Sequence, residues 1–343
     1  MRKNSGLIAR HSARCWGEAI RTILCLSLTI AVVVAGAIAE AQQTGKIFRI
    51  GFLDVSTASG MAVLIDAFRE ELTKLGWSEG KSFTIEYWFT EGKNDRLPEL
   101  AADLVRSKVD LIVVTGGPAP VAAKKATTTI PIVMASGGDP VGAGLVASLA
   151  RPGGNVTGLS SLNPELNTKR LEILKDAIPR LSRVGLLRSP VTNLQVKEIR
   201  AAAPSLKLRL EEIETEPDPK GLEIAFQTAN EKQVGAIMTI TSTRLFAQRK
   251  RIVELANKYR LPAIYFQKEF VDEGGLMSYG VEYDDLYRRA AVYVDKILKG
   301  AKPAELPVQQ ATKFEFVINL NAAKQIGLVI PNRVLERANQ VIK

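Results

Sequence analysis

Short runs of consecutive apolar residues alternate with amphipathic stretches through most of this chain, and that alternation constrains the fold more than any other feature. Runs such as Leu111–Val114 and Ala263–Phe266 are apolar at every position. Strands buried on both faces of a parallel sheet have this character. Between such runs lie stretches with helical periodicity, for example Leu64, Phe68 and Leu72. The pattern predicts an α/β fold in which helices cover both faces of parallel sheets.

The alternation occurs as two successive series, and each predicts a doubly wound lobe. The strands predicted for the first series are 48–53, 83–89, 111–114, 132–134 and 156–159, and those for the second are 184–187, 206–213, 236–240 and 263–266. The remaining tail is too short for a third domain, so we expect it to cross between the lobes. The predicted boundaries are 46–160 plus 281–303 for lobe 1 and 161–280 plus 304–343 for lobe 2. The predicted crossings, which together make a multi-crossing hinge, lie near 160–164, 279–283 and 302–307.

The first 41 residues have the pattern of a secretory signal peptide. A basic segment precedes an apolar run over 23–39, which ends in the small residues Ala37-Ile38-Ala39. This order of a basic region, an apolar core and an A-x-A ending is typical of a cleaved export signal. The alternative is a retained membrane anchor, since the run is at the short end of what spans a bilayer. The sequence therefore predicts an exported, periplasmic protein with cleavage after Ala39 or Ala41.

The positions of His and Cys exclude several classes of enzyme. His11, Cys15 and Cys25 are the only ones in the chain, and all three lie in the predicted signal peptide. Without them, the mature chain has no Cys/His metal site, no thiol nucleophile and no imidazole base. We therefore predict no metal and no cofactor, and no catalysis that needs a thiol or an imidazole. The enzyme alternative left open is a hydrolase with paired carboxylates, such as Asp139 with Asp284 or Asp285.

The net charge of +10 raises the question of nucleic acid binding. The basic residues are distributed along the chain among acidic ones. The densest cluster, Arg244 with Arg249–Arg251, falls on a predicted helix that also carries Glu254. A solvated helix face is the better interpretation, and export argues against a nucleic acid partner as well.

Polar loops follow the predicted strands in both lobes, and ligands of such sheets bind outside the carboxyl ends of the strands. The loops are rich in small and hydroxyl residues, whose N–H and O–H groups can receive a carboxylate. Asp139 can hold an amino group. The alternative for each residue is an N-cap or a turn. The loops are 54–60, 115–118 and 135–140 in lobe 1 and 188–190, 241–243 and 267–269 in lobe 2. Tyr279, near a predicted crossing, is an aromatic candidate that can pack on a ligand ring or in the hinge.

One block of sequence resembles a known family. The run Gly144–Ser160, with Arg151-Pro152-Gly153-Gly154-Asn155-Val156-Thr157-Gly158 at its centre, is similar to a signature of ABC-transporter substrate-binding proteins of the family that includes tryptophan and tyrosine binders. Similar segments also occur at Ile50–Leu53, Leu75–Trp77, Asp139-Pro140, Tyr279–Val281 and Phe316–Ala323. The resemblance extends over about residues 46–335.

The resemblance implies a type I periplasmic-binding fold with three crossings and no catalysis. It implies a ligand-binding set of eight residues: Ser56, Thr57, Thr115, Gly116, Ser136, Asp139, Thr241 and Tyr279. It also implies a monomer that delivers a small solute to an inner-membrane ABC permease. Two loops, Ser56–Ser59 and Thr241–Thr243, differ from the commoner pattern of the family. We therefore expect a ligand with a carboxylate, which can be an amino acid or an aromatic compound. The alternative is an exported sensor component that presents its ligand to a membrane receptor.

Overall fold

A computed structural model describes residues 46–161, 165–190 and 193–343 of the chain. The predicted signal peptide over 1–41 lies outside the described residues. Within those residues, no helix is both long enough and apolar enough to cross a membrane. The segments Phe48–Glu79 and Phe83–Lys343 form one compact unit that contains two sheets.

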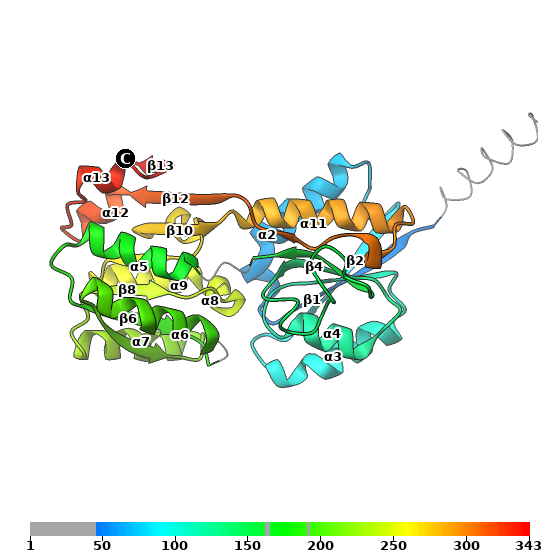
Figure 1. The fold of residues 1–343 in the computed structure, drawn as a ribbon, viewed down its shortest axis with the longest axis horizontal. Helices are drawn as coiled ribbons and strands as arrows, with labels where there is room; N and C mark the ends of the chain where they lie inside the picture. The colour runs from blue at the N-terminus through cyan, green and yellow to red at the C-terminus, as the bar shows by residue number, and fades with distance from the viewer. Residues whose placement is uncertain (1–45, 162–164, 191–192) are drawn as a thin grey trace, which may run out of the picture. The chain divides into compact units, whose positions relative to one another are not determined.

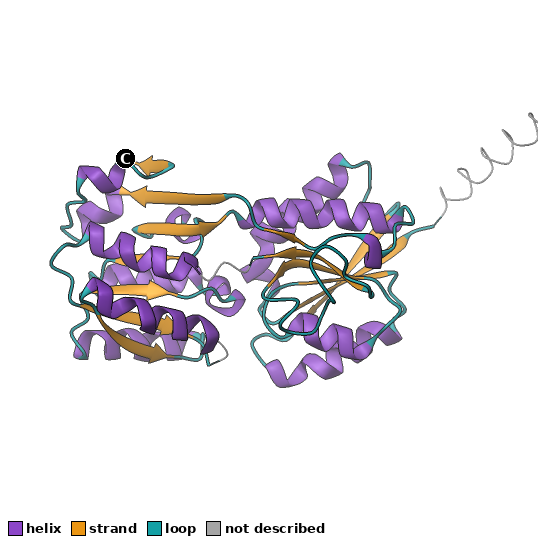
Figure 2. Ribbon diagram, in the orientation of Figure 1, coloured by secondary structure: helices purple, strands orange, loops and turns teal. Residues whose placement is uncertain are grey.

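Lobe 1 is built on a parallel sheet that has six strands among the described residues, in the order β11-β5-β4-β3-β1-β2 (Figure 1). The strands are β1 (Phe48–Asp54), β2 (Phe83–Phe89), β3 (Leu111–Val114), β4 (Ile132–Gly137), β5 (Val156–Ser160) and β11 (Gln309–Gln310). Helices α2 (Ala58–Lys74) and α11 (Tyr283–Leu298) cover one face, and α3 (Leu97–Arg106) and α4 (Ala119–Ala126) cover the other (Figure 2).

The central strands of lobe 1 are buried on both faces because successive side chains point to opposite sides. In β3, Val113 packs with the core under α2 and α11, and its neighbours Ile112 and Val114 pack with the core under α3 and α4. Gly76, with φ +92°, follows the C-cap of α2, as the sequence predicts for a helix-ending glycine.

Lobe 2 is built on a second sheet, with seven strands among the described residues, in the order β13-β12-β10-β9-β8-β6-β7. The strands are β6 (Arg183–Arg188), β7 (Arg209–Glu214), β8 (Ala236–Thr239), β9 (Ala263–Tyr265), β10 (Met277–Val281), β12 (Phe314–Asn319) and β13 (Gln340–Ile342). Its helices are α5 (Glu165–Ala177), α6 (Asn193–Ala202), α7 (Pro219–Glu231), α8 (Thr243–Ala247), α9 (Arg249–Lys258), α10 (Glu269–Asp272), α12 (Leu320–Gln325) and α13 (Asn332–Leu335). Helix α5 lies against β8, β9 and β10, and α7 packs against β7 and α9.

The chain passes between the sheets three times. It leaves the first sheet after Ser160, returns between Val281 of β10 and Tyr283 of α11, and leaves again between β11 and β12. The third crossing lies at 311–313, later than the predicted 302–307, because β11 pairs with β5 of the first sheet. The segment 304–310 therefore belongs to lobe 1 in the structure, whereas the predicted boundaries place it in lobe 2.

One strand departs from the purely parallel sheets that the sequence predicts. Strand β12 runs antiparallel to β10, with Phe314 opposite Val281. Because the chain leaves lobe 2 at the carboxyl end of β10 and comes back at the same edge, the returning strand has to run the other way. The crossings thus fix the direction of β12.

The block that carries the family resemblance is structural. The Nδ2 of Asn155 donates to the carbonyl oxygens of Thr127 (3.1 Å) and Ile130 (2.9 Å) and so holds the loop before β4. At Gly158, φ is +122°, and a Cβ there would lie 2.3 Å from the carbonyl oxygen of Met134. Only glycine allows β4 and β5 to approach in this way.

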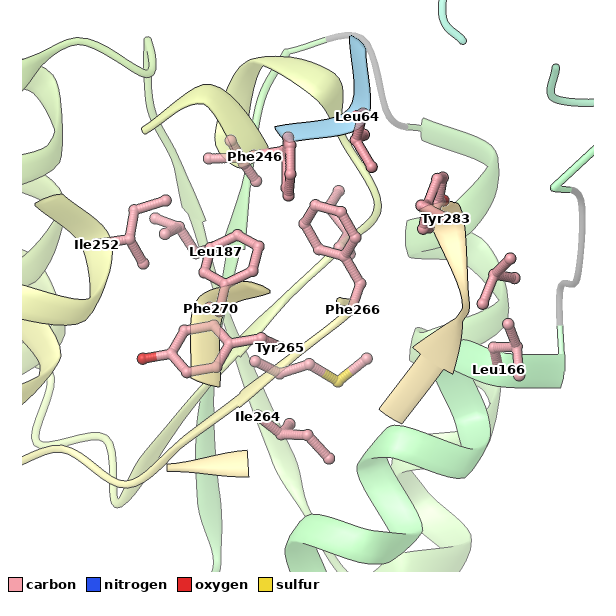
Figure 3. Packing of buried hydrophobic residues seen from close by; sticks show 14 of the residues in the cluster. Leu64, Leu166, Leu187, Phe246, Ile252, Ile264, Tyr265, Phe266, Phe270 and Tyr283 are labelled. Atoms are coloured by element: carbon pink, nitrogen blue, oxygen red, sulfur yellow. The ribbon is translucent and has the colours of Figure 1, made fainter. Parts of the chain in front are cut away.

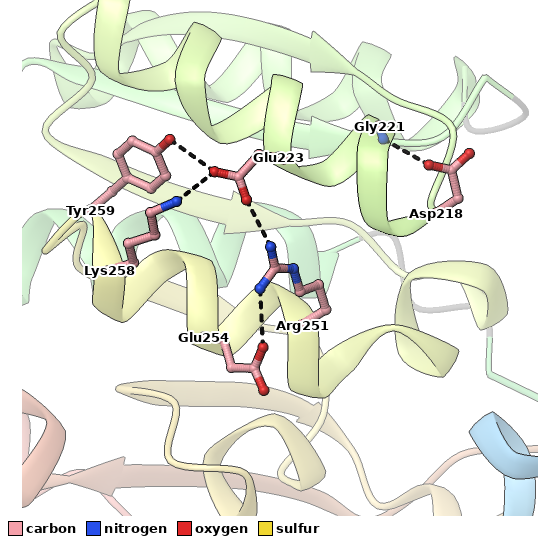
Figure 4. Close-up of polar contacts among 7 residues, drawn as sticks. All are labelled: Asp218, Gly221, Glu223, Arg251, Glu254, Lys258 and Tyr259. Carbon is pink, nitrogen blue, oxygen red and sulfur yellow. Dashed lines mark hydrogen bonds and ion pairs between the residues drawn. The ribbon is translucent and has the colours of Figure 1, made fainter.

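The basic cluster on α8 and α9 is paired with acidic side chains. Arg251 contacts Glu223 (2.7 Å) and Glu254 (3.3 Å), and Lys258 also contacts Glu223 (Figure 4). Arg244 and Arg249 pair with Glu216 and Glu273 and are only 14% and 13% exposed. The cluster is therefore an ion-paired surface that is solvated in part, and it does not offer a row of free cations to a nucleic acid.

Candidate functional site

A cavity of about 210 Å³ lies at the carboxyl ends of the strands of both sheets. Lobe 1 lines it with residues that follow β1, β3 and β4, such as Val55, Gly116 and Gly138. Lobe 2 lines it with residues that follow β8 and β9, such as Thr241 and Phe266. This is the edge at which the sequence analysis expected a ligand, because the strands of a parallel sheet present their loops there.

In lobe 1, a buried carboxylate holds the loops beneath the cavity. Asp54, at the end of β1, is fully buried. Its Oδ1 accepts hydrogen bonds from the N (2.6 Å) and Oγ (2.5 Å) of Ser56, and its Oδ2 accepts one from Thr115 Oγ1. Burial raises the pKa of Asp54, and the hydrogen bonds from Ser56 and Thr115 oppose that rise. Asp54 therefore fixes the loop after β1 to the loop after β3.

In lobe 2, helix α5 brings a buried arginine to the cavity. Arg170 is 2% exposed and lines the cavity wall. Its Nε donates to the backbone oxygen of Tyr279 (2.6 Å), and its Nη1 donates to Oδ1 of Asn167 (2.6 Å). Burial lowers the pKa of the Arg170 guanidinium to about 10, so the group stays positively charged at neutral pH.

Aromatic and aliphatic side chains form the apolar wall of the cavity. Phe246 and Phe266 line it from lobe 2, and both pack on Phe270, with ring centroids 6.2 and 5.2 Å away. Figure 3 shows this cluster, with Leu64 of lobe 1 beside Phe246. Tyr283, the first residue of α11, also lines the cavity and directly follows the second crossing. Burial raises the pKa of its hydroxyl, while hydrogen bonds with Ser161 and Thr241 lower it.

Three of the eight residues predicted to bind the ligand line the cavity: Gly116, Ser136 and Thr241. Ser56 and Thr115 are buried and bonded to Asp54, as described above.

The other three lie outside the cavity lining. Thr57 is the N-cap of α2, where its Oγ1 accepts from the N of Gly60 (3.1 Å). Asp139 is exposed and accepts from the N of Val141 and of Gly142 within its own turn. Tyr279 packs edge-on against Phe316 and contributes its backbone oxygen to Arg170.

Arg170, Gln267 and Phe266 line the cavity but are not among the eight residues predicted from the sequence. Gln267 belongs to a polar loop after a predicted strand, so its position could have been found by the rule applied to the other loops. Arg170 lies in the middle of a helix next to Lys169, where a basic residue is expected at the surface. Among the described residues, no group of three or more His, Cys, Asp or Glu side chains is arranged to hold a metal ion.

Comparison with known proteins identifies the family. A family model described as "ABC transporter substrate binding protein" matches residues 51–342. The chain belongs to the ABC transporter substrate-binding protein family. A tyrosine-binding protein of Clostridioides difficile is 28% identical over 270 residues, which cover 76% of this chain and 75% of the relative.

Solved structures agree with this assignment. An ABC domain of Streptococcus pneumoniae in complex with L-Trp is 29% identical, with a TM-score of 0.76, over 87% of this chain and 100% of that one. A conserved domain protein of Vibrio cholerae is 28% identical, with a TM-score of 0.78, over 86% of this chain and all of that one. A glucose-galactose binding protein of Geobacillus stearothermophilus, 14% identical with a TM-score of 0.56, shares the fold.

As an ABC transporter substrate-binding protein, this chain is a binding component and not an enzyme. Its fold is the periplasmic-binding-protein fold, which confirms the predicted α/β architecture of two sheet-based lobes. Substrate-binding proteins of ABC transporters work outside the cytoplasm, bind a small molecule and have a permease as partner. The predicted family and the predicted absence of enzymatic activity are therefore confirmed.

Proposed function

We propose that this protein captures a small carboxylate-bearing solute in the cavity between its lobes and delivers it to the membrane permease of an ABC importer. The observation that carries the proposal is the cavity itself, because both lobes line it at the carboxyl ends of their strands. A volume of about 210 Å³ equals the liquid volume of about seven water molecules. That space suits a small solute and not an oligomer.

Capture requires the two lobes to meet, and contacts between them are present. Nη1 of Arg249, in lobe 2, donates to the backbone oxygen of Gly60 in α2 of lobe 1 (2.9 Å). A Cβ at Gly60 would lie 2.4 Å from the Cβ of Ala247, so α2 and α8 approach closely at this point. We propose that the ligand favours this arrangement because residues of both lobes can contact it only when the lobes are together.

The apolar wall and the relatives support an amino acid or an aromatic compound as the ligand. The relatives that are 28–29% identical include a tyrosine-binding protein and a structure with L-Trp. In this chain, Phe246 and Phe266 offer aromatic surface to the cavity. We further propose that the first 41 residues act as a cleaved signal peptide, so that the mature protein works in the periplasm. We also propose that the mature protein is a monomer.

The test is a thermal-shift screen of the purified protein against amino acids, aromatic acids, short organic acids and nucleosides. A free ligand at about a hundred times its dissociation constant adds roughly 2.7 kcal/mol to the free energy of unfolding and raises the midpoint. We expect one class of carboxylates to do so without being chemically changed. The proposal is contradicted if no compound of the panel raises the midpoint.

A matched pair of variants assigns the binding to the cavity. Gly138 lines the cavity, and a Cβ there meets nothing within 4 Å, so Gly138→Phe should fill the space without a backbone clash. Gly154 is equally open but lies outside the cavity lining, which makes Gly154→Phe the control. We expect the ligand-induced gain to disappear in the first variant and persist in the second. A gain that persists in both would place the ligand elsewhere.

A further inference from the structure

Arg170 differs from the other largely buried arginines of lobe 2, because it has no acidic partner among the side chains that the structure describes. The comparable side chains are each 13–14% exposed and each within ion-pair distance of a carboxylate: Arg188 with Glu214 (2.5 Å), Arg244 with Glu216 (2.5 Å) and Arg249 with Glu273 (3.3 Å). Arg170 is more deeply buried, at 2% exposed. Yet no carboxylate among the side chains that the structure describes, which leave out that of residue 165, lies within ion-pair distance of it. Its charge is uncompensated within the described part of the chain.

The two neutral acceptors of Arg170 fix the guanidinium but leave much of its donor capacity unused. A guanidinium has five N–H donors in a rigid planar fork. One N–H on Nε and one on Nη1 are taken by Tyr279 and Asn167. For Nη2, no acceptor exists among the described residues. The two hydrogen bonds thus fix the orientation of the guanidinium and leave Nη2 for another acceptor.

An uncompensated buried charge is costly, and the cost is relieved when an anion binds beside it. The carboxylate is the small group that matches the guanidinium fork, because its two oxygens can accept two parallel hydrogen bonds. Arg170 lines the cavity, so a carboxylate bound in the cavity lies on the side from which the guanidinium can be contacted.

A second donor in the same cavity has no partner. Gln267 is 3% exposed, and its Nε2 is buried without an acceptor among the described residues. It follows β9, whereas Arg170 comes from α5, so the two donors reach the cavity from different elements of lobe 2. Unpaired buried donors are rare in native proteins and call for an explanation. A ligand oxygen supplies the missing acceptor.

We propose that Arg170 is the anion receptor of the cavity, with Gln267 as a second donor, and that the ligand is a monocarboxylate with an apolar or aromatic body. The body faces the wall that Phe246 and Phe266 form. The inference deepens the proposed function and depends on it. The carboxylate can belong to a simple acid or to an α-amino acid, because both offer the same group to Arg170 and Gln267. Among the described lining residues, Glu198 is the acidic side chain that can meet an ammonium group.

The experiment compares acids with their own primary amides, because the pair keeps the apolar body and removes only the charge. The probes are benzoate, phenylacetate, 3-phenylpropanoate, indole-3-acetate and hexanoate, each with its amide, together with L-phenylalanine, L-tyrosine and L-tryptophan with their amides. Calorimetric titration of the purified protein gives the affinity ratio of acid to amide. Losing a charge-assisted hydrogen bond costs about a factor of ten to a hundred in affinity. We expect the wild type to prefer the acid by about that factor.

Variants then assign the preference to Arg170. In Arg170→Gln, we expect the acid and the amide to bind with nearly equal affinity. Arg170→Lys keeps the charge without the fork and should give an intermediate ratio. Arg188→Gln is the matched control, because Arg188 is a buried, ion-paired arginine of the same lobe outside the cavity lining. It should keep the wild-type ratio. Thermal unfolding checks that each variant is folded.

The outcomes separate the two proposals. If the acids bind but the acid-to-amide ratio stays unchanged in Arg170→Gln, the inference is wrong and the proposed function stands. If the wild type binds amides as tightly as acids, the inference fails without any variant. If none of the acids binds, both the inference and the proposed carboxylate solute fail. If only the amino acids bind, and Glu198→Gln weakens them selectively, the carboxylate comes from an α-amino acid.

Discussion

The two lobes contribute different chemistry to the same cavity. Lobe 1 presents small neutral groups, such as Gly116 and Ser136, and its buried acid Asp54 is bonded within the lobe. Lobe 2 presents a buried guanidinium, Arg170, and an unpaired amide, Gln267. Two lobes of similar topology thus differ in where their buried charges find partners. The buried charge of lobe 1 is hydrogen-bonded inside the lobe, whereas that of lobe 2 keeps N–H groups without an acceptor among the described residues. Neutral polar atoms without a partner occur in both lobes, such as Asn94 Oδ1 in lobe 1 and Gln267 Nε2 in lobe 2.

The difference assigns separate roles to the lobes. A lobe whose loops are held by a buried carboxylate supplies a preformed surface. A lobe with unpaired donors is stabilised when a ligand binds, because the ligand supplies the missing hydrogen-bond acceptors. Substitutions in lobe 1 should therefore act mainly on folding, and substitutions at the cavity face of lobe 2 mainly on ligand affinity.

The largest expected effect is on the stability of lobe 1. Asp54→Ala removes the acceptor of three buried hydrogen bonds and leaves the donors of Ser56 and Thr115 unsatisfied. We expect a loss of about 4 kcal/mol in the free energy of unfolding, measured by urea denaturation. Asp54→Asn keeps a carbonyl oxygen for Ser56 and should lose less. Equal losses in the two variants would show that hydrogen bonding at Asp54 is not what stabilises the lobe.

The second prediction concerns a buried acid of lobe 2. Glu269, at the start of α10, is 5% exposed, and burial raises its pKa from an ordinary value near 4.5 to about 7. The positive charge of Lys268 opposes this rise in pKa, and the negative charges of Asp284 and Asp272 add to it. The folded protein then holds a proton that the unfolded chain has lost. Its contribution to stability is therefore present below pH 4.5 and is lost as the pH rises to about 7.

Glu269→Gln should remove that contribution, which amounts to roughly 3 kcal/mol between pH 4.5 and 7. Unfolding by urea at a series of pH values measures it. We expect the stability of the wild type to fall more steeply than that of the variant over this interval. Parallel curves would mean that Glu269 is ionised in the folded protein.

The third prediction tests the contact between the lobes. Arg249→Met keeps an apolar stem against the ring of Phe246 but removes the hydrogen bond to Gly60 of lobe 1. Because that bond forms only when the lobes meet, its loss should weaken the affinity for the ligand about fivefold, as calorimetry would show. Arg251→Met on the same helix is the control, since its partners Glu223 and Glu254 both lie in lobe 2. Equal weakening in the two variants would contradict a role for the inter-lobe contact.

The smallest effect is expected at Asp139, an exposed side chain of lobe 1. Its Oδ1 caps the turn that contains Val141 and Gly142. Asp139→Ala should lower the free energy of unfolding by about 1 kcal/mol, the usual value for a lost cap. The ligand affinity should stay the same. If the affinity falls while the melting temperature is unchanged, Asp139 contacts the ligand and the division between the lobes is less strict than we infer.

The sequence predicted the two series of strands and helices, because a strand that is buried on both faces has apolar residues at successive positions. It predicted the edge of the sheets at which the cavity lies for the same reason, because the loops follow directly from the strands. It did not predict β11, a two-residue strand whose pairing with β5 depends on residues 150 positions away. Local periodicity carries no information about such a pairing.

The side chains of the site were harder to predict than its position. Ser56 and Thr115 lie in the expected loops, but their hydroxyls are bonded to Asp54, and nothing in a loop sequence fixes that direction. Arg170 has the local sequence of a surface residue. Its burial results from α5 lying against β10, where its partner Tyr279 is 109 residues away. Side-chain direction is thus set by tertiary contacts that the sequence pattern does not contain.

The most direct measurement is a crystal structure of the protein with the tightest ligand from the thermal-shift screen. The division of roles predicts a carboxylate within hydrogen-bond distance of the Arg170 guanidinium and of Gln267 in lobe 2. The apolar body should lie against Phe246 and Phe266, with Gly116 and Ser136 of lobe 1 closing the other side. A ligand whose charged group faces lobe 1, or one bound outside the cavity, would contradict the account.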